Sequence, residues 1–182
     1  MNLTMYNRIH ALYGQHIFKR SVLSIRQGAG GIEWAMAGKG YRTAVEIGTY
    51  RGVGAAEMSQ YCERVVTIDL HHGRMEQLEE THDRHAFWRS LGVENVELAL
   101  VADDRQKARL LKNLAFDFAF IDGAHGPNIA ADFALVRRCG HVLFHDYDRR
   151  GARELDHVAD FIDSLPRHEV QTRDIFALWT AA

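Results

Sequence analysis

The 182-residue sequence is poor in cysteine and has no long apolar run. Its two cysteines, Cys62 and Cys139, are isolated thiols, and neither a disulfide framework nor a zinc-binding spacing can be built from them. No stretch is apolar over enough residues to span a bilayer, and the first residues lack the apolar core of a secretion signal. We therefore expect a cytoplasmic protein that does not enter a membrane.

The sequence also lacks a surplus of either charge, with 22 Lys and Arg against 24 Asp and Glu and a formal net charge of -2. A general nucleic-acid-binding protein normally shows a basic surplus, so the composition disfavours nucleic acid as a partner. Basic residues do outnumber acidic ones within residues 1–40. Such a cluster is usually a solvated face, and an anionic substrate is the less favoured interpretation.

What is present is enough apolar sequence for one domain, because 47% of the residues are apolar and 182 residues can bury a core of their own. We expect a single domain over 1–182, with a helical N-terminal segment (1–40) and a catalytic core (43–182). The N-terminal segment is expected to close over the active site or to pack on the sheet. A homodimer is compatible with the sequence.

From residue 43 the pattern alternates between strand and helix. Strands are expected at 43–48, 65–69, 95–101, 116–122 and 141–145, and helices at 53–62, 74–91, 104–114, 127–138 and 151–164. Two strand-like runs, 167–172 and 174–180, then follow too closely for a helical crossover and must form an antiparallel hairpin. The pattern predicts an α/β, Rossmann-like fold: a mostly parallel seven-stranded sheet with an antiparallel C-terminal hairpin and helices on both faces.

The first strand runs into a glycine-punctuated turn, E-x-G-x-x-x-G, which spans Glu46, Gly48 and Gly52. Glycine allows the backbone to turn tightly and to approach a ligand closely. A dinucleotide fingerprint would read G-x-G-x-x-G, but Tyr50 occupies its second glycine position. An NAD-dependent oxidoreductase is therefore an alternative that the sequence disfavours.

Each parallel strand ends at a carboxylate, and the carboxyl ends of parallel strands share one edge of the sheet. These carboxylates are Glu46, Asp69, Asp103, Asp122 and Asp146. Any one of them is more simply a helix N-cap, but five in succession favour a cationic ligand over a pyrophosphate. Asp69 lies about 20 residues after the glycine turn, the spacing at which an acid meets ribose hydroxyls in this topology.

The glycine turn resembles motif I of the class I S-adenosylmethionine-dependent methyltransferases. Residues 116–125 (F-D-F-A-F-I-D-G-A-H) and 140–147 (G-H-V-L-F-H-D-Y) are similar to the F-D-x-x-F-I-D-G-x-H and G-G-x-x-x-x-H-D-Y segments of a small-molecule and O-methyltransferase-like subgroup. The resemblance implies S-adenosylmethionine as cofactor, with Glu46 orienting its methionine end and Ala102 and Asp103 beside its adenine. The cofactor-binding set that we expect is Glu46, Gly48, Thr49, Tyr50, Gly52, Asp69, Leu70, Ala102, Asp103 and Asp122.

The expected reaction is methyl transfer to a hydroxyl or an amine of a small molecule. Such an acceptor can need a base, and His125 and His145 are the candidates because both follow strand ends and an imidazole titrates near neutrality. Asp122 and Asp146 could hold Mg²⁺, which prefers oxygen ligands. Ala124 stands where the subgroup often has a second acid, which counts against the metal. A non-catalytic cofactor-binding or interaction domain remains the third alternative.

Overall fold

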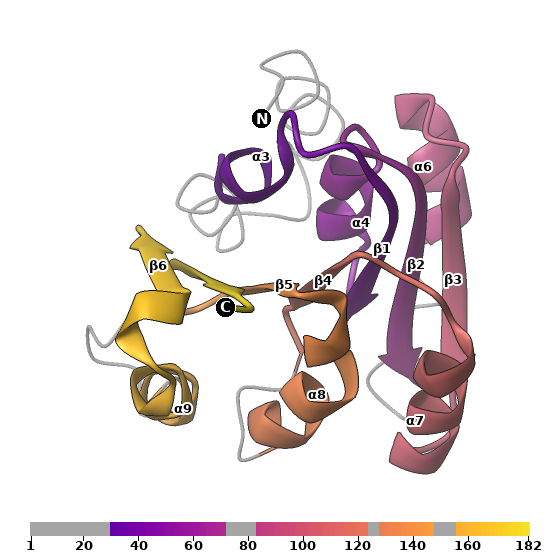
Figure 1. Cartoon of the computed structure of the whole chain (residues 1–182). Helices are drawn as coiled ribbons and strands as arrows, with labels where there is room; N and C mark the ends of the chain where they lie inside the picture. Colours follow the sequence, from indigo (N-terminus) through magenta and orange to yellow (C-terminus); the bar gives the residue numbers. More distant parts are fainter. Residues whose placement is uncertain (1–29, 72–82, 124–127, 148–155) are drawn as a thin grey trace.

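The computed structural model describes residues 30–71, 83–123, 128–147 and 156–182, which form a seven-stranded sheet with helices on both faces (Figure 1). The strands lie in the order β3-β2-β1-β4-β5-β7-β6. They are β1 (Tyr41–Ile47), β2 (Cys62–Leu70), β3 (Val96–Val101), β4 (Phe118–Ile121), β5 (His141–Phe144), β6 (Val170–Arg173) and β7 (Phe176–Thr180). β1 to β5 pair in parallel, whereas β7 is antiparallel to both β5 and β6. The predicted fold class is confirmed, including the terminal hairpin.

Two apolar cores lie on opposite faces of the sheet because successive side chains of a strand point to opposite faces. In β1, Ala44 belongs to the core under α3 (Gly31–Met36), α4 (Val53–Met58) and α6 (Arg84–Leu91). Its neighbour Val45 belongs to the core under α7 (Asp104–Asn113), α8 (Ile129–Val136) and α9 (Asp156–Ser164). The central strand is therefore covered on both faces, as in other parallel sheets of α/β proteins.

Several element boundaries differ from those expected. The helix predicted over 53–62 ends at Met58, because the chain turns at 59–61 and β2 already begins at Cys62. The helix predicted to reach residue 138 gives way at Arg137 to a 3-10 turn, η1 (Arg137–Cys139), and a second such turn, η2 (Arg167–Glu169), precedes β6. The predicted stop at Gly92 is confirmed, since this residue caps α6 in the left-handed conformation. Residues 1–29, 72–82 and 148–155, which include most of the predicted N-terminal helices, lie outside the described residues.

The strand order reverses between β1 and β4, and ligands of open α/β sheets bind at such a switch point, outside the carboxyl ends of the strands. β1 and β4 end level, since Ile47 pairs with Ile121, and β2 continues from Ile68, the partner of Ile47, to Leu70. The segments that follow these strands therefore start side by side. None of the helices in the described part of the chain is long and apolar enough to span a bilayer.

Candidate active site

The glycine turn between β1 and α4 packs directly on the segment that follows β4. Gly48 has a φ of 99°, and a Cβ built there would collide with the carbonyl oxygen of Asp122 and lie 2.6 Å from the Cα of Gly123. The sequence suggested that this glycine leaves space for a ligand. The structure shows that it leaves space for the neighbouring loop, which brings Asp122 close to the turn, and the approach of a ligand stays a prediction.

Asp69, at the end of β2, holds the same turn by its backbone. Its Oδ2 accepts a hydrogen bond from the Tyr50 N–H at 2.8 Å, and its Oδ1 accepts one from the Leu70 N–H at 2.9 Å. Tyr50 adopts a left-handed conformation with a φ of 42°, and 41% of its surface is exposed. The structure thus brings Tyr50, Asp69 and Leu70 together, as the sequence led us to expect.

Glu46 and Thr49 point into the protein interior. Glu46 is 1% exposed, and its Oε2 accepts a hydrogen bond of 2.5 Å from the hydroxyl of Thr67, which also lies 2.6 Å from the hydroxyl of Thr49. Burial raises the pKa of Glu46 well above its usual value, although the hydrogen bond from Thr67 acts in the opposite direction. The other carboxyl oxygen lies against α4, where a side chain at Gly54 would collide with it. Both carboxyl oxygens of Glu46 thus lie against the protein, and the contact with the cofactor that the resemblance implied stays a prediction.

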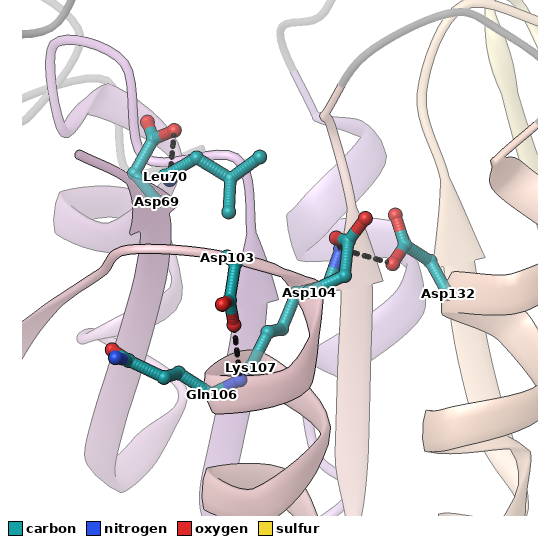
Figure 2. A network of polar contacts seen from close by, with 7 residues as sticks. All are labelled: Asp69, Leu70, Asp103, Asp104, Gln106, Lys107 and Asp132. Atoms are coloured by element: carbon teal, nitrogen blue, oxygen red, sulfur yellow. Dashed lines mark hydrogen bonds and ion pairs between the residues drawn. The ribbon is translucent and has the colours of Figure 1, made fainter. Parts of the chain in front are cut away.

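The end of β3 is organised as a helix cap. Asp103 is the N-cap of α7, and its Oδ1 accepts a hydrogen bond from the Gln106 N–H at 2.8 Å (Figure 2). The side-chain oxygen of Gln106 in turn accepts one from the Ala102 N–H at 3.0 Å. Ala102 and Asp103 therefore lie at the expected edge, exposed, but each already has a capping partner.

A buried ion pair stands beside this cap and joins two helices. Lys107 of α7 lies 2.6 Å from Asp132 of α8 and 2.8 Å from Asp104 (Figure 2). Lys107 and Asp132 are each 6% exposed, whereas the side chain of Asp104 is 63% exposed. The network fixes α7 against α8 close to the loops that follow β3 and β4.

Asp122, His145 and Asp146 form a compact cluster at the ends of β4 and β5. His145 Nδ1 lies 2.9 Å from Asp122 Oδ1 and 3.0 Å from Asp146 Oδ1, and one potential ligand atom from each residue lies within 4.8 Å of the others. The rings of Phe176 and Phe120 pack on the imidazole, with centroids 5.1 Å and 6.2 Å away. Within the described residues this is the one group of three or more His, Cys, Asp or Glu side chains that could hold a metal ion.

The protonation of His145 differs from what the sequence suggested. Burial on its own lowers the pKa of His145, but the carboxylates of Asp122 and Asp146 outweigh it and raise the pKa to about 10. The imidazole is therefore protonated at neutral pH in this arrangement, and a protonated imidazole cannot accept a proton. The expectation that His145 titrates near neutrality is wrong for this geometry. His125, the other candidate base, lies outside the described residues.

Sequence reasoning missed four polar residues around the site: Thr67, Arg84, Trp88 and Lys107. Thr67 faces the same side of the sheet as the buried Glu46, and the two lie opposite each other in the β1–β2 register, a pairing that the sequence does not contain. Arg84 and Trp88 are four residues apart and so share one face of α6, but the glycine turn to which their side chains donate hydrogen bonds is distant in the sequence.

A sequence profile of the methyltransferase domain family matches residues 45–147 of the chain. A comparison with curated proteins gives no match. Among solved structures, the chain is similar to the O-methyltransferase TomG of Streptomyces achromogenes, in complex with SAM, at 20% identity and a TM-score of 0.67, covering 100% of this chain and 91% of that one. It is also similar to the cofactor-bound protein Rv0187 from MTB, at 18% identity and a TM-score of 0.67, covering 99% and 90%.

A third similar structure is the O-methyltransferase of Bacillus cereus in complex with SAH, at 15% identity and a TM-score of 0.59, covering 100% of this chain and 92% of that one. Identities this low speak for a shared fold, whereas the family profile spans more than half of the chain and includes the glycine turn, Asp69 and the His145–Asp146 pair. The chain shares its fold with these solved structures, and it belongs to the methyltransferase domain family.

Proposed function

We propose that this protein transfers a methyl group from S-adenosylmethionine to a hydroxyl group of a small molecule, at the carboxyl edge of the sheet between β2 and β5. The observation that carries the proposal is the position of Asp69, a carboxylate at the end of β2 that is bonded to the glycine turn beside the topological switch point. The structural similarity to O-methyltransferases favours oxygen over nitrogen as the acceptor atom for this protein.

The residues at this edge fit the proposed cofactor. S-adenosylmethionine supplies a methyl group on a positively charged sulfur. Each oxygen of Asp69 accepts one backbone N–H and can accept another hydrogen bond, so Asp69 suits the two hydroxyls of a ribose. Ala102 and Asp103 lie at the neighbouring strand end and would flank the adenine. Glu46 would act indirectly, by holding Thr67 and Thr49 beneath the turn.

The acceptor side of the proposed site is the cluster of Asp122, His145 and Asp146. The carboxylates of Asp122 and Asp146 lie within 4.8 Å of each other and supply oxygen ligands of the kind that fits a divalent cation such as Mg²⁺. A bound cation would lower the pKa of an acceptor hydroxyl. Without one, His145 carries a proton that neutralises part of the carboxylate charge, and it would orient the acceptor rather than deprotonate it.

Substitution of Asp69 tests the cofactor site. Asp69→Ala removes an acceptor of the ribose hydroxyls and releases the Tyr50 N–H, and we expect it to weaken binding of S-adenosylmethionine by roughly 1.5–3 kcal/mol. Isothermal titration calorimetry measures this loss. Asp104→Ala is the matched control, because it removes an exposed carboxylate that pairs with Lys107 rather than with the glycine turn. Wild-type affinity in Asp69→Ala would place the cofactor elsewhere.

The reaction itself is tested by following S-adenosylhomocysteine with a panel of hydroxylated small molecules. Acceptor-dependent formation of this product supports an enzyme. Binding of the cofactor without turnover of any acceptor would favour a non-catalytic cofactor-binding domain. A thermal shift with NAD but none with S-adenosylmethionine would favour the oxidoreductase alternative.

The metal requirement is tested with the same assay. We expect excess EDTA to abolish turnover and added Mg²⁺ to restore it, and we expect Asp146→Asn to raise the Mg²⁺ concentration that gives half-maximal activity. The control variant is Asp163→Asn, which changes a carboxylate on α9 that accepts a hydrogen bond from the Tyr147 hydroxyl. Turnover that is indifferent to both EDTA and Mg²⁺ would contradict the metal site.

A further inference from the structure

Two side chains of α6 reach across to the glycine turn and donate hydrogen bonds to its carbonyl groups. Arg84 Nη1 donates to the carbonyl oxygen of Tyr50 at 3.1 Å, and Trp88 Nε1 donates to the carbonyl oxygen of Gly52 at 2.8 Å. The two residues are one helical turn apart and are only 3% and 2% exposed. Neither bond is part of the sheet or of the helix itself.

These contacts act on a turn whose backbone is strained at Tyr50. Tyr50 has a φ of 42° and Gly52 one of 78°, and a left-handed conformation is unfavourable for a residue with a side chain. The Tyr50 residue is held from both sides, because its N–H donates to Asp69 and its carbonyl accepts from Arg84. A strained conformation persists only where its surroundings determine it, and such residues cluster at ligand-binding sites.

Trp88 also fills the space beside Gly52. A Cβ built at Gly52 would lie 2.7 Å from the indole nitrogen, so the ring and the turn are already in close contact. The indole is in turn held by α6. Asp83 caps this helix by accepting a hydrogen bond from the Ala86 N–H at 2.9 Å, and the ring of His85 packs edge-on against the indole, with the ring centroids 5.3 Å apart. The indole therefore has little room to move away from the turn.

We propose that Arg84 and Trp88 are positioning residues that hold the turn between β1 and α4 in its cofactor-binding conformation, and so set the affinity for S-adenosylmethionine. The inference rests on the proposed function and extends it to a helix outside the edge of the sheet. The two side chains act through the carbonyl groups of Tyr50 and Gly52, and neither is expected to touch the reacting atoms.

Trp88→Phe and Arg84→Met test this role. Trp88→Phe removes one hydrogen bond and keeps an apolar ring, and we expect a roughly threefold to tenfold increase in the Kd of S-adenosylmethionine and of S-adenosylhomocysteine. Arg84→Met removes a charged donor and should raise Kd by roughly tenfold or more. The control is Arg89→Ala on the same helix, whose side chain is 70% exposed, and it should leave Kd unchanged.

A kinetic comparison separates positioning from simple loss of stability. With cofactor at saturation, kcat of both variants should stay within about twofold of wild type while the KM for S-adenosylmethionine rises, because the bonds act on binding rather than on the chemistry. Thermal unfolding of each variant without ligand gives the folded fraction, to which Kd is corrected. An unchanged corrected Kd in both variants, or a fall in kcat with KM unchanged, would overturn the proposal.

A double-mutant cycle with Gly52→Ala tests the contact directly. Gly52→Ala should weaken cofactor binding strongly in the wild-type background, since its methyl group meets the indole. In the Trp88→Phe background the same change should weaken binding less, because phenylalanine lacks the atoms that the methyl group meets. Equal effects in the two backgrounds would contradict the contact.

The outcome of the wild-type titration separates this inference from the proposed function. If wild-type protein binds neither S-adenosylmethionine nor S-adenosylhomocysteine, the proposed function fails and the inference fails with it. If wild type binds both and the α6 variants bind equally well, the inference alone fails.

Discussion

Glu57 is a carboxyl group that the proposed reaction does not use, and its burial makes the stability of the protein depend on pH. The residue lies on α4, is 4% exposed, and its Oε1 has no hydrogen-bond partner among the residues that the structure describes. Burial raises its pKa to about 7 from an ordinary value of 4.5. The folded protein therefore keeps a proton on Glu57 at pH values where the unfolded chain releases it.

The free energy of unfolding therefore falls as the pH rises from 4.5 towards 7, by up to about 1.4 kcal/mol per pH unit, because the unfolded chain releases the Glu57 proton and the folded protein keeps it. Above pH 7 both states are ionised and the loss levels off. Glu57→Gln keeps the shape without the charge, so we expect it to be more stable than wild type at pH 8 and to remove most of this dependence. Urea unfolding at pH 5 and pH 8 measures the difference.

The exposed Glu94 supplies the control, because Glu94→Gln should leave the pH dependence as it is in wild type. If wild type and Glu57→Gln lose the same free energy of unfolding between pH 5 and pH 8, the raised pKa of Glu57 is refuted.

Gly48 and Gly38 form a matched pair that separates backbone strain from steric collision. Both have positive φ values, 99° and 72°, but a Cβ at Gly38 meets nothing within 4 Å, whereas one at Gly48 collides with the segment after β4. Gly38→Ala should lower the free energy of unfolding by about 1–2 kcal/mol, from backbone strain alone. Gly48→Ala should lower it by roughly 1–3 kcal/mol more. Equal losses for Gly38→Ala and Gly48→Ala in urea unfolding would mean that the glycine turn and the segment after β4 are not in contact.

At the scale of elements, the pair of Lys107 and Asp132 joins α7 to α8 (Figure 2). A buried charge that loses its partner is strongly unfavourable, so we expect Lys107→Met to lower the free energy of unfolding by roughly 3–5 kcal/mol. The double variant Lys107→Met/Asp132→Leu removes both charges and should recover most of that loss. Chemical denaturation of the single and double variants measures both quantities.

Asp104→Ala is the control for this pair, since its carboxylate is largely exposed and its contact with Lys107 should contribute less than about 1 kcal/mol. A double variant that is no more stable than Lys107→Met would show that the pair stabilises through packing rather than charge.

At the scale of the whole molecule, the sheet could be predicted from the sequence because the alternation of apolar strands and helices is a local pattern. The antiparallel hairpin was equally accessible, since Asp174 and Ile175 leave too little chain between β6 and β7 for any crossover. The convergence of Asp122 and Asp146 also followed, because β4 and β5 are adjacent parallel strands and both residues come just after their ends.

What the sequence did not contain was the direction and the partner of each polar side chain. Glu46 is turned into the protein by the two-residue period of β1, which places it on the α4 side with Ala44. The raised pKa of His145 depends on two carboxylates whose distances only the folded chain sets. The bonds from Arg84 and Trp88 likewise depend on the placement of α6 against a turn more than 30 residues away.

The place of β7 within the sheet has a consequence for biosynthesis. This strand, residues 176–180, is made after all the others, yet it lies between β5 and β6 and supplies Phe176 to one core and Trp179 to the other. While the ribosome is still translating the hairpin, β5 has an unpaired edge and both cores lack an aromatic side chain. A nascent chain stalled before Phe176 would thus expose the unpaired edge of β5 to neighbouring nascent chains on the polysome. We expect the need for chaperone protection to be greatest in that interval.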